Sequence, residues 1–191
     1  MNTNQIGLMF GSSLLVGIVA LAIFSSHRSQ KVNSELSASI GHCFSVLTNQ
    51  RGLTLEITPP FQHSMMGEIP VPPRLRGEID GISVEIFTEN NLASDGDTQT
   101  VLRLGARRGS ADWPNIAAPG KHKTMTPMRA RPAFEQLCSA SHRIEVGSRH
   151  LIAVPKIVAR TDWHGRTHRV ELDPGRLDVW LGLALNVARR L

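Results

Sequence analysis

The chain begins with its longest run of apolar positions. Residues 6–24 form a stretch of 19 without a charged side chain, and every Asp, Glu, Lys and Arg follows it. A helix of that length covers roughly 28 Å, close to the hydrocarbon thickness of a bilayer. We therefore predict a transmembrane helix over 6–24 that contacts the lipid bilayer, a short tail over 1–5, and a single soluble domain over 25–191.

The apolar run is interpreted as a retained anchor, with a cleaved signal peptide or a buried soluble helix as alternatives. A signal peptide needs a basic start and a small-residue cleavage site. Residues 1–5 carry no basic side chain, and residues 25–28 read Ser-Ser-His-Arg. The nearest basic residues, Arg28 and Lys31, follow the span, so the positive-inside rule favours a cytoplasmic domain over a periplasmic one.

Two small residues in the span are spaced for helix packing. Gly7 and Gly11 form a GxxxG, which lets two helix backbones approach closely. The alternatives are a homo-oligomer formed through this face and a span in which glycine is incidental.

After the anchor, the spacing of apolar residues is helical in some segments and typical of strands in others. Apolar residues recur at three- and four-residue spacing at both ends of the domain, whereas the middle alternates with period two. The expected helices span 31–50, 133–140 and 174–191, and the expected strands span 53–57, 75–79, 82–87, 100–106, 143–146, 149–154, 156–161 and 166–172. Residues 59–73 and 90–98 are expected to be loops. The pattern predicts an α+β fold with a mainly antiparallel sheet of about seven strands and flanking helices.

The clearest local signals are a hairpin and a helix start. Asp80-Gly81 separates two alternating runs, which is typical of a type I′ turn. Asp80 is therefore interpreted as a turn residue. Asp173 followed by Pro174 has the residue types of an N-cap and a first helical position.

Positive charge is concentrated in one segment. Residues 107–132 hold six basic side chains against one acid, Asp112, and so carry the whole net charge of +5. The six are Arg107, Arg108, Lys121, Lys123, Arg129 and Arg131. We expect this segment to be a structureless, proline-containing loop that contacts anionic lipid or an acidic partner, with a solvated loop of incidental charge as the alternative. The chain has no Tyr, which makes aromatic stacking of single-stranded nucleic acid an unlikely activity.

No catalytic, cofactor-binding or metal-binding residue is predicted. The GxSxG, HExxH, GxxxxGK[ST] and strand-linked GxGxxG motifs are absent from positions where they would act. Cys43 and Cys138 are expected to be small core residues, with a disulfide, or a zinc site that includes His42 and His142, as alternatives. His164 and His168 are expected to be structural or surface histidines.

The soluble part resembles a loose group of bacterial membrane-anchored proteins of unknown function. The resemblance rests on residues 75–84 (LRGEIDGISV), the later strand with Thr100, and the closing helix over 177–191. It implies a location at the bacterial inner membrane and supplies no catalytic residues. The basic segment over 107–132 departs from the group's pattern.

These patterns lead to one main hypothesis and two alternatives. The main hypothesis is a non-enzymatic scaffold or accessory subunit of a membrane-associated assembly. The first alternative is an enzyme without a linear motif, with a site among His42, Glu135, His142 and Asp162. The second is a membrane-tethered nucleic-acid binder that uses the basic segment.

Overall fold

The computed structural model describes residues 34–63, 67–69, 71–91, 97–107, 109, 111–118, 126–158, 160–161 and 167–191. The predicted transmembrane helix over 6–24, with Gly7 and Gly11, lies outside this range. Within the described residues, none of the helices combines the length and apolar character needed to cross a membrane. The anchor therefore stays a prediction.

The chain divides into two compact units. One comprises Met1–Ala38 and Pro59–Val71, and the other comprises Ser39–Thr58 and Pro72–Leu191. In the first unit, β2 (Phe61–His63) and β3 (Gly67–Ile69) pair as an antiparallel hairpin. The sequence had indicated only a loop here, because strands of three residues are too short to show a period.

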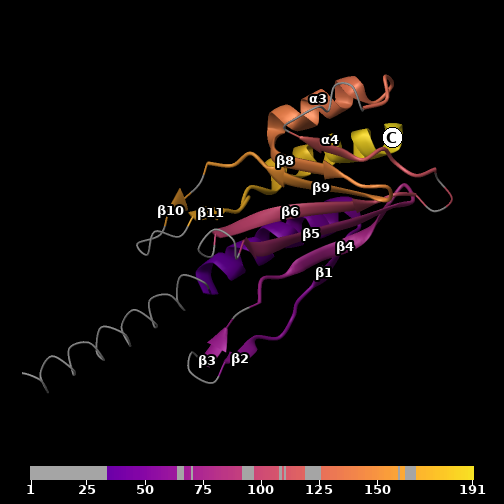
Figure 1. The fold of residues 1–191 in the computed structure, drawn as a ribbon. Coiled ribbons are helices and arrows are strands. Elements are labelled where there is room, and N and C mark those ends of the chain that lie inside the picture. Colours follow the sequence, from indigo (N-terminus) through magenta and orange to yellow (C-terminus); the bar gives the residue numbers. More distant parts are fainter. Residues whose placement is uncertain are drawn as a thin grey trace, which may run out of the picture. The chain divides into compact units, whose positions relative to one another are not determined.

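The second unit is an α+β structure built on one mainly antiparallel sheet, as predicted (Figure 1). Seven strands follow the order β1-β4-β5-β6-β9-β8-β7, and all six pairings between them are antiparallel. They are β1 (Thr54–Glu56), β4 (Arg74–Ile79), β5 (Ile82–Asn91), β6 (Asp97–Gly105), β7 (Ile116–Ala118), β8 (Ser141–Val146) and β9 (His150–Pro155). A pair formed by β10 (Arg160–Thr161) and β11 (Thr167–Arg169) extends the sheet, with β11 parallel to β6.

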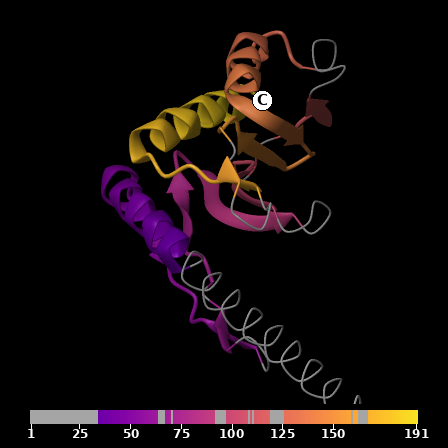
Figure 2. The ribbon, with the colours of Figure 1, turned by 90° about the vertical axis from the view of Figure 1, so that its left-hand side faces the viewer.

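Among the described residues, three helical segments contribute to this unit. They are the helix over residues 34–51, of which 39–51 belong here, α3 (Arg131–Ala140) and α4 (Pro174–Arg190). Helix α4 packs against β6 and β9, and α3 packs against α4 and β8 (Figure 2). Their apolar stripes bury residues such as Phe44, Phe134 and Leu181 against the sheet.

The predicted hairpin and closing helix are confirmed. Asp80 and Gly81 have φ values of 53° and 80°, as a type I′ turn requires. The alternate residues Ile82, Val84 and Ile86 that follow are all buried. Asp173 caps α4 by accepting hydrogen bonds from the main-chain N–H groups of Gly175 at 2.9 Å and Arg176 at 3.2 Å.

The structure departs from prediction in the basic segment. A structureless stretch was expected over 107–132, but Ile116–Ala118 forms β7 and pairs with β8. Ile116 is buried opposite Val146, so long-range pairing creates a strand that the local sequence does not show. The β5–β6 hairpin is also longer than expected, because polar residues pair as far as Asn91 and Asp97.

Candidate interaction surface

The described arginines of the basic segment contact different elements of the protein. Arg129 donates through Nε to the main-chain oxygen of Arg190 at 2.7 Å and through Nη2 to that of Leu191 at 3.0 Å. Arg107 lies over the Asp80-Gly81 turn, where its Nε is 2.9 Å from the position of a Cβ added at Gly81. Arg131 is half-buried at the start of α3, and Arg108, Lys121 and Lys123 lie outside the described residues.

The two cysteines are free thiols in different surroundings. Burial, and secondarily the charges of Glu171 and Asp173, raise the pKa of Cys43 from 9.0 to about 11. Burial also raises the pKa of Cys138, with a smaller contribution from Glu135. The structure therefore does not form the disulfide that was an alternative.

The proposed metal and enzyme residues do not come together where they are described. His42, His142 and Glu135 are all exposed. No group of three or more His, Cys, Asp and Glu side chains within the described ranges is placed to hold a metal ion. His168 lies on β11 opposite Arg160, while Asp162 and His164 are outside the described residues.

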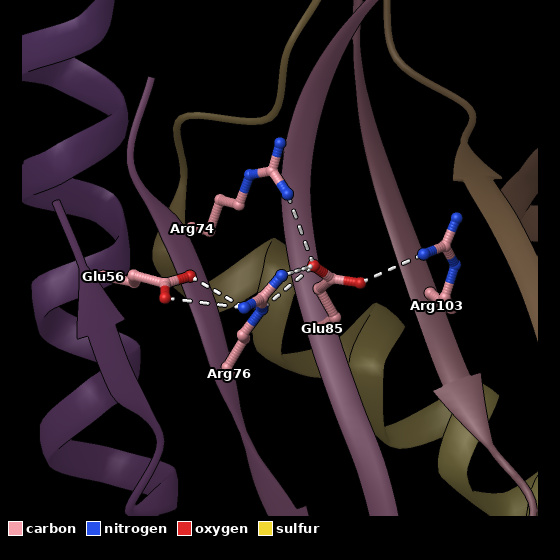
Figure 3. Close-up of polar contacts among 5 residues, drawn as sticks. All are labelled: Glu56, Arg74, Arg76, Glu85 and Arg103. Carbon is pink, nitrogen blue, oxygen red and sulfur yellow. Dashed lines mark hydrogen bonds and ion pairs between the residues drawn. The ribbon is translucent and has the colours of Figure 1, made fainter. Parts of the chain in front are cut away.

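A cluster of charged residues lies instead on the outward face of the sheet (Figure 3). Side chains alternate between the two faces of a strand, so the neighbours of buried Leu75, Ile86 and Leu102 point away from the helices. The strand register places Arg76 opposite Glu85, and Glu85 opposite Arg103. We call the set Glu56, Arg74, Arg76, Glu85, Phe87 and Arg103 the arginine face.

Glu85 is the centre of the arginine face. Its Oε1 lies 2.8 Å from Arg76 Nη2 and 3.6 Å from Arg74 Nη1, and its Oε2 lies 3.3 Å from Arg103 Nη1. Glu56 approaches Arg76 from β1, with Oε2 3.2 Å from Nη1. Figure 3 shows three guanidinium groups around one carboxylate, with α4 behind the strands.

At the centre of this face, the carboxylate is less exposed to solvent than the guanidinium groups around it. The Glu85 side chain is 16% exposed, whereas those of Arg74, Arg76 and Arg103 are 42%, 50% and 52% exposed. The hydrogen bond from Arg76 to Glu85, and then the charges of Glu85 and Glu56, raise the pKa of Arg76 further above its ordinary value. The arginines therefore present positive charge to solvent while the central carboxylate lies below them.

The ring of Phe87 contacts two of these three arginines. The Cζ atoms of Arg74 and Arg103 lie 5.4 Å and 5.5 Å from the centroid of its ring, within the range of cation–π attraction. Phe87 is itself buried in an apolar cluster with Val101 and Val154. Two of the three guanidinium groups are thus held by both a carboxylate and an aromatic ring, which restricts their rotamers before any ligand binds.

The sequence analysis did not predict the arginine face, although the sequence contains a weak signal for it. Arg74 and Arg76 flank apolar Leu75, and Glu85 and Arg103 occupy polar positions of alternating strands. Alternation predicts that each side chain points outward, but it does not show which strands are neighbours or in what register.

Comparison of the chain with protein-family models, curated proteins and solved structures finds no match. The resemblance to bacterial membrane-anchored proteins therefore stays a prediction. Function must be argued from the residues themselves.

Proposed function

We propose that this chain is a non-enzymatic, single-pass accessory protein of the bacterial inner membrane, whose cytoplasmic domain binds an acidic protein segment through the arginine face. The apolar run over 6–24 supports the membrane anchor. The arrangement of Arg74, Arg76 and Arg103 over Glu85 is the observation that supports the binding role.

The chemistry of the arginine face suits carboxylates. A guanidinium group has five N–H donors in a planar fork that matches a carboxylate. Arg74 and Arg103 each approach Glu85 through Nη1, whereas Arg76 donates to it through Nε and Nη2 and pairs with Glu56 through Nη1. Because Glu85 and Phe87 already order these arginine side chains, the arginines lose less conformational entropy when a ligand binds.

The spacing of the charges favours an extended peptide over mobile lipid head groups. Arg74 and Arg76 are two residues apart on β4, which separates their Cα atoms by about 7 Å in a strand. The acidic side chains at alternate positions of an extended peptide have that same repeat. In this proposal, the basic segment over 107–132 adds positive charge that attracts the partner at longer range.

The test measures binding of an extended acidic peptide to the full chain in phosphatidylcholine nanodiscs. The probe is a fluorescein-labelled peptide with Glu at alternate positions, and the same peptide with Gln is its control. The triple variant Arg74→Gln, Arg76→Gln, Arg103→Gln removes the cations of the face. The matched control is Arg51→Gln, Arg149→Gln, Arg176→Gln, which removes three other exposed, ion-paired arginines and changes the net charge equally.

We expect the first triple variant to lose most of the affinity for the Glu peptide and the control triple to retain it. Equal losses in both variants would mean that only net charge matters, and the proposal would be wrong. If phosphatidylglycerol in the disc engages the arginine face while the peptide does not, the face binds lipid and the acidic-segment proposal is overturned. Carbonate washing of cell membranes tests the anchor separately, because an integral protein stays in the pellet.

A further inference from the structure

A cavity of about 390 Å³ lies where the Asp80-Gly81 turn meets the C-terminal end of α4. Ile82, Trp113 and Ala188 form apolar parts of its wall, and all three are buried. Its volume falls within the range of cavities that hold small molecules, roughly 300–1,000 Å³. The cavity is separate from the arginine face, with which it shares no residue.

The charged lining of this cavity is strongly unequal. Arg107, Arg129 and Arg189 line it together with one carboxylate, Asp80. The charges of the lining side chains, three arginines and one aspartate, therefore sum to +2. The basic segment supplies Arg107 and Arg129, whereas Arg189 comes from the last turn of α4. The local charge of residues 107–132 gives no sign that Arg189 lies beside them.

Contacts within the protein hold each arginine in place. Arg189 forms an ion pair with Asp80. Arg129 donates to the main-chain oxygens of Arg190 and Leu191, which offsets the partial negative charge at this end of the helix. Arg107 crosses the turn at Gly81, where there is no side chain to displace it.

We propose that this cavity binds a phosphate monoester with a small apolar substituent. A phosphate monoester carries about −1.5 to −2 charges at pH 7, which matches the lining charge better than a carboxylate or a phosphodiester does. Guanidinium groups donate to phosphate oxygens in pairs, and the walls of Ile82 and Trp113 would contact the substituent. The ligand is either a soluble phosphate monoester or a lipid head group of the same chemistry.

The test is calorimetric titration of the full chain in phosphatidylcholine nanodiscs with phenyl phosphate. Benzenesulfonate has a similar shape and a single charge, so it isolates the effect of the second charge. Inorganic phosphate isolates the effect of the apolar substituent. The variants are Arg107→Gln and Arg107→Lys, and Arg176→Gln, which lies outside both the cavity and the arginine face, is the control with the same change in net charge.

Phenyl phosphate should bind more tightly than either control compound. Arg107→Gln should weaken it about ten- to hundredfold, the usual cost of losing a charge-assisted hydrogen bond. Arg107→Lys should weaken it less, because Lys keeps the charge without the planar fork. Arg176→Gln should leave the affinity for phenyl phosphate unchanged.

The proposal is overturned if phenyl phosphate does not bind, if benzenesulfonate binds equally well, or if Arg107→Gln and Arg176→Gln weaken binding equally. Phosphatidic acid added to the disc identifies the source of the ligand: competition assigns the cavity to the lipid head group, and no competition assigns it to a soluble ester. Neither result depends on peptide binding at the arginine face, so the two proposals succeed or fail separately.

Discussion

The N-cap of α4 allows a quantitative test of how local sequence stabilises this domain. Asp173 Oδ1 accepts hydrogen bonds from the main-chain N–H groups of Gly175 and Arg176. These N–H groups lie in the first turn and have no carbonyl partner within the helix. Replacing an N-cap Asp with Ala typically costs about 1 kcal/mol, within a range of roughly 0.5–2. The cap supports a helix whose buried stripe includes Leu177 and Leu181, so the loss should be global and not local to the first turn.

The variants are Asp173→Ala and Asp173→Asn, each compared with wild type in the full chain in nanodiscs. Asn caps about as well as Asp, so Asp173→Asn should unfold close to the wild-type temperature. For a domain of this size, 1 kcal/mol lowers Tm by roughly 2–4 °C, and Asp173→Ala should fall in that range. Tryptophan fluorescence and circular dichroism during heating give the two Tm values. An Ala variant as stable as wild type would refute the capping argument, and an Asn variant as unstable as the Ala variant would mean that charge, not hydrogen bonding, is responsible.

Three further predictions concern other parts of the molecule. Gly81→Ala should lower Tm more than Gly109→Ala does, because both glycines have positive φ but only Gly81 lies against Arg107. Folding raises the pKa of Cys43 from 9.0 to about 11, so its thiol should contribute stability that is fully present below pH 9 and lost as pH rises toward 11. In unfolding measured as a function of pH, the Cys43→Ala variant should lose less stability than wild type between pH 9 and 11. In cells, a single cysteine placed at Ser94 of an otherwise Cys-free chain should react with an impermeant maleimide only after lysis, and labelling of intact cells would place the domain in the periplasm.

Local signals account for the parts of the fold that sequence alone predicted. The Asp80-Gly81 turn and the Asp173-Pro174 helix start depend on neighbouring residues only, and both are where they were expected. β7 was missed because it exists only through pairing with β8, more than twenty residues later in the chain. Its three residues are too few for a period.

The candidate sites also combine features that the local sequence predicts with features that only tertiary pairing creates. Counting charge along the chain identified the basic segment, but it could not show that Arg129 bonds to the end of α4, about sixty residues away in sequence. The arginine face depends on the register of four strands, which places Glu56 opposite Arg74 and diagonal to its ion-pair partner Arg76, and Glu85 opposite Arg103. Such contacts are set by tertiary pairing, and the alternation within one strand does not contain that information.

Arginine side-chain NMR tests the central claim most directly, because it reports where an acidic segment binds. The full chain in phosphatidylcholine nanodiscs, labelled with ¹⁵N, is titrated with the alternating Glu peptide while the Nε–H signals are followed. Single Arg→Gln variants assign these signals. We expect the signals of Arg74, Arg76 and Arg103 to shift together with one affinity, the Arg51 signal to stay unchanged, and added salt to reverse the shifts. Shifts confined to other arginines, or none at all, would contradict the claim that this face of the sheet binds the acidic segment.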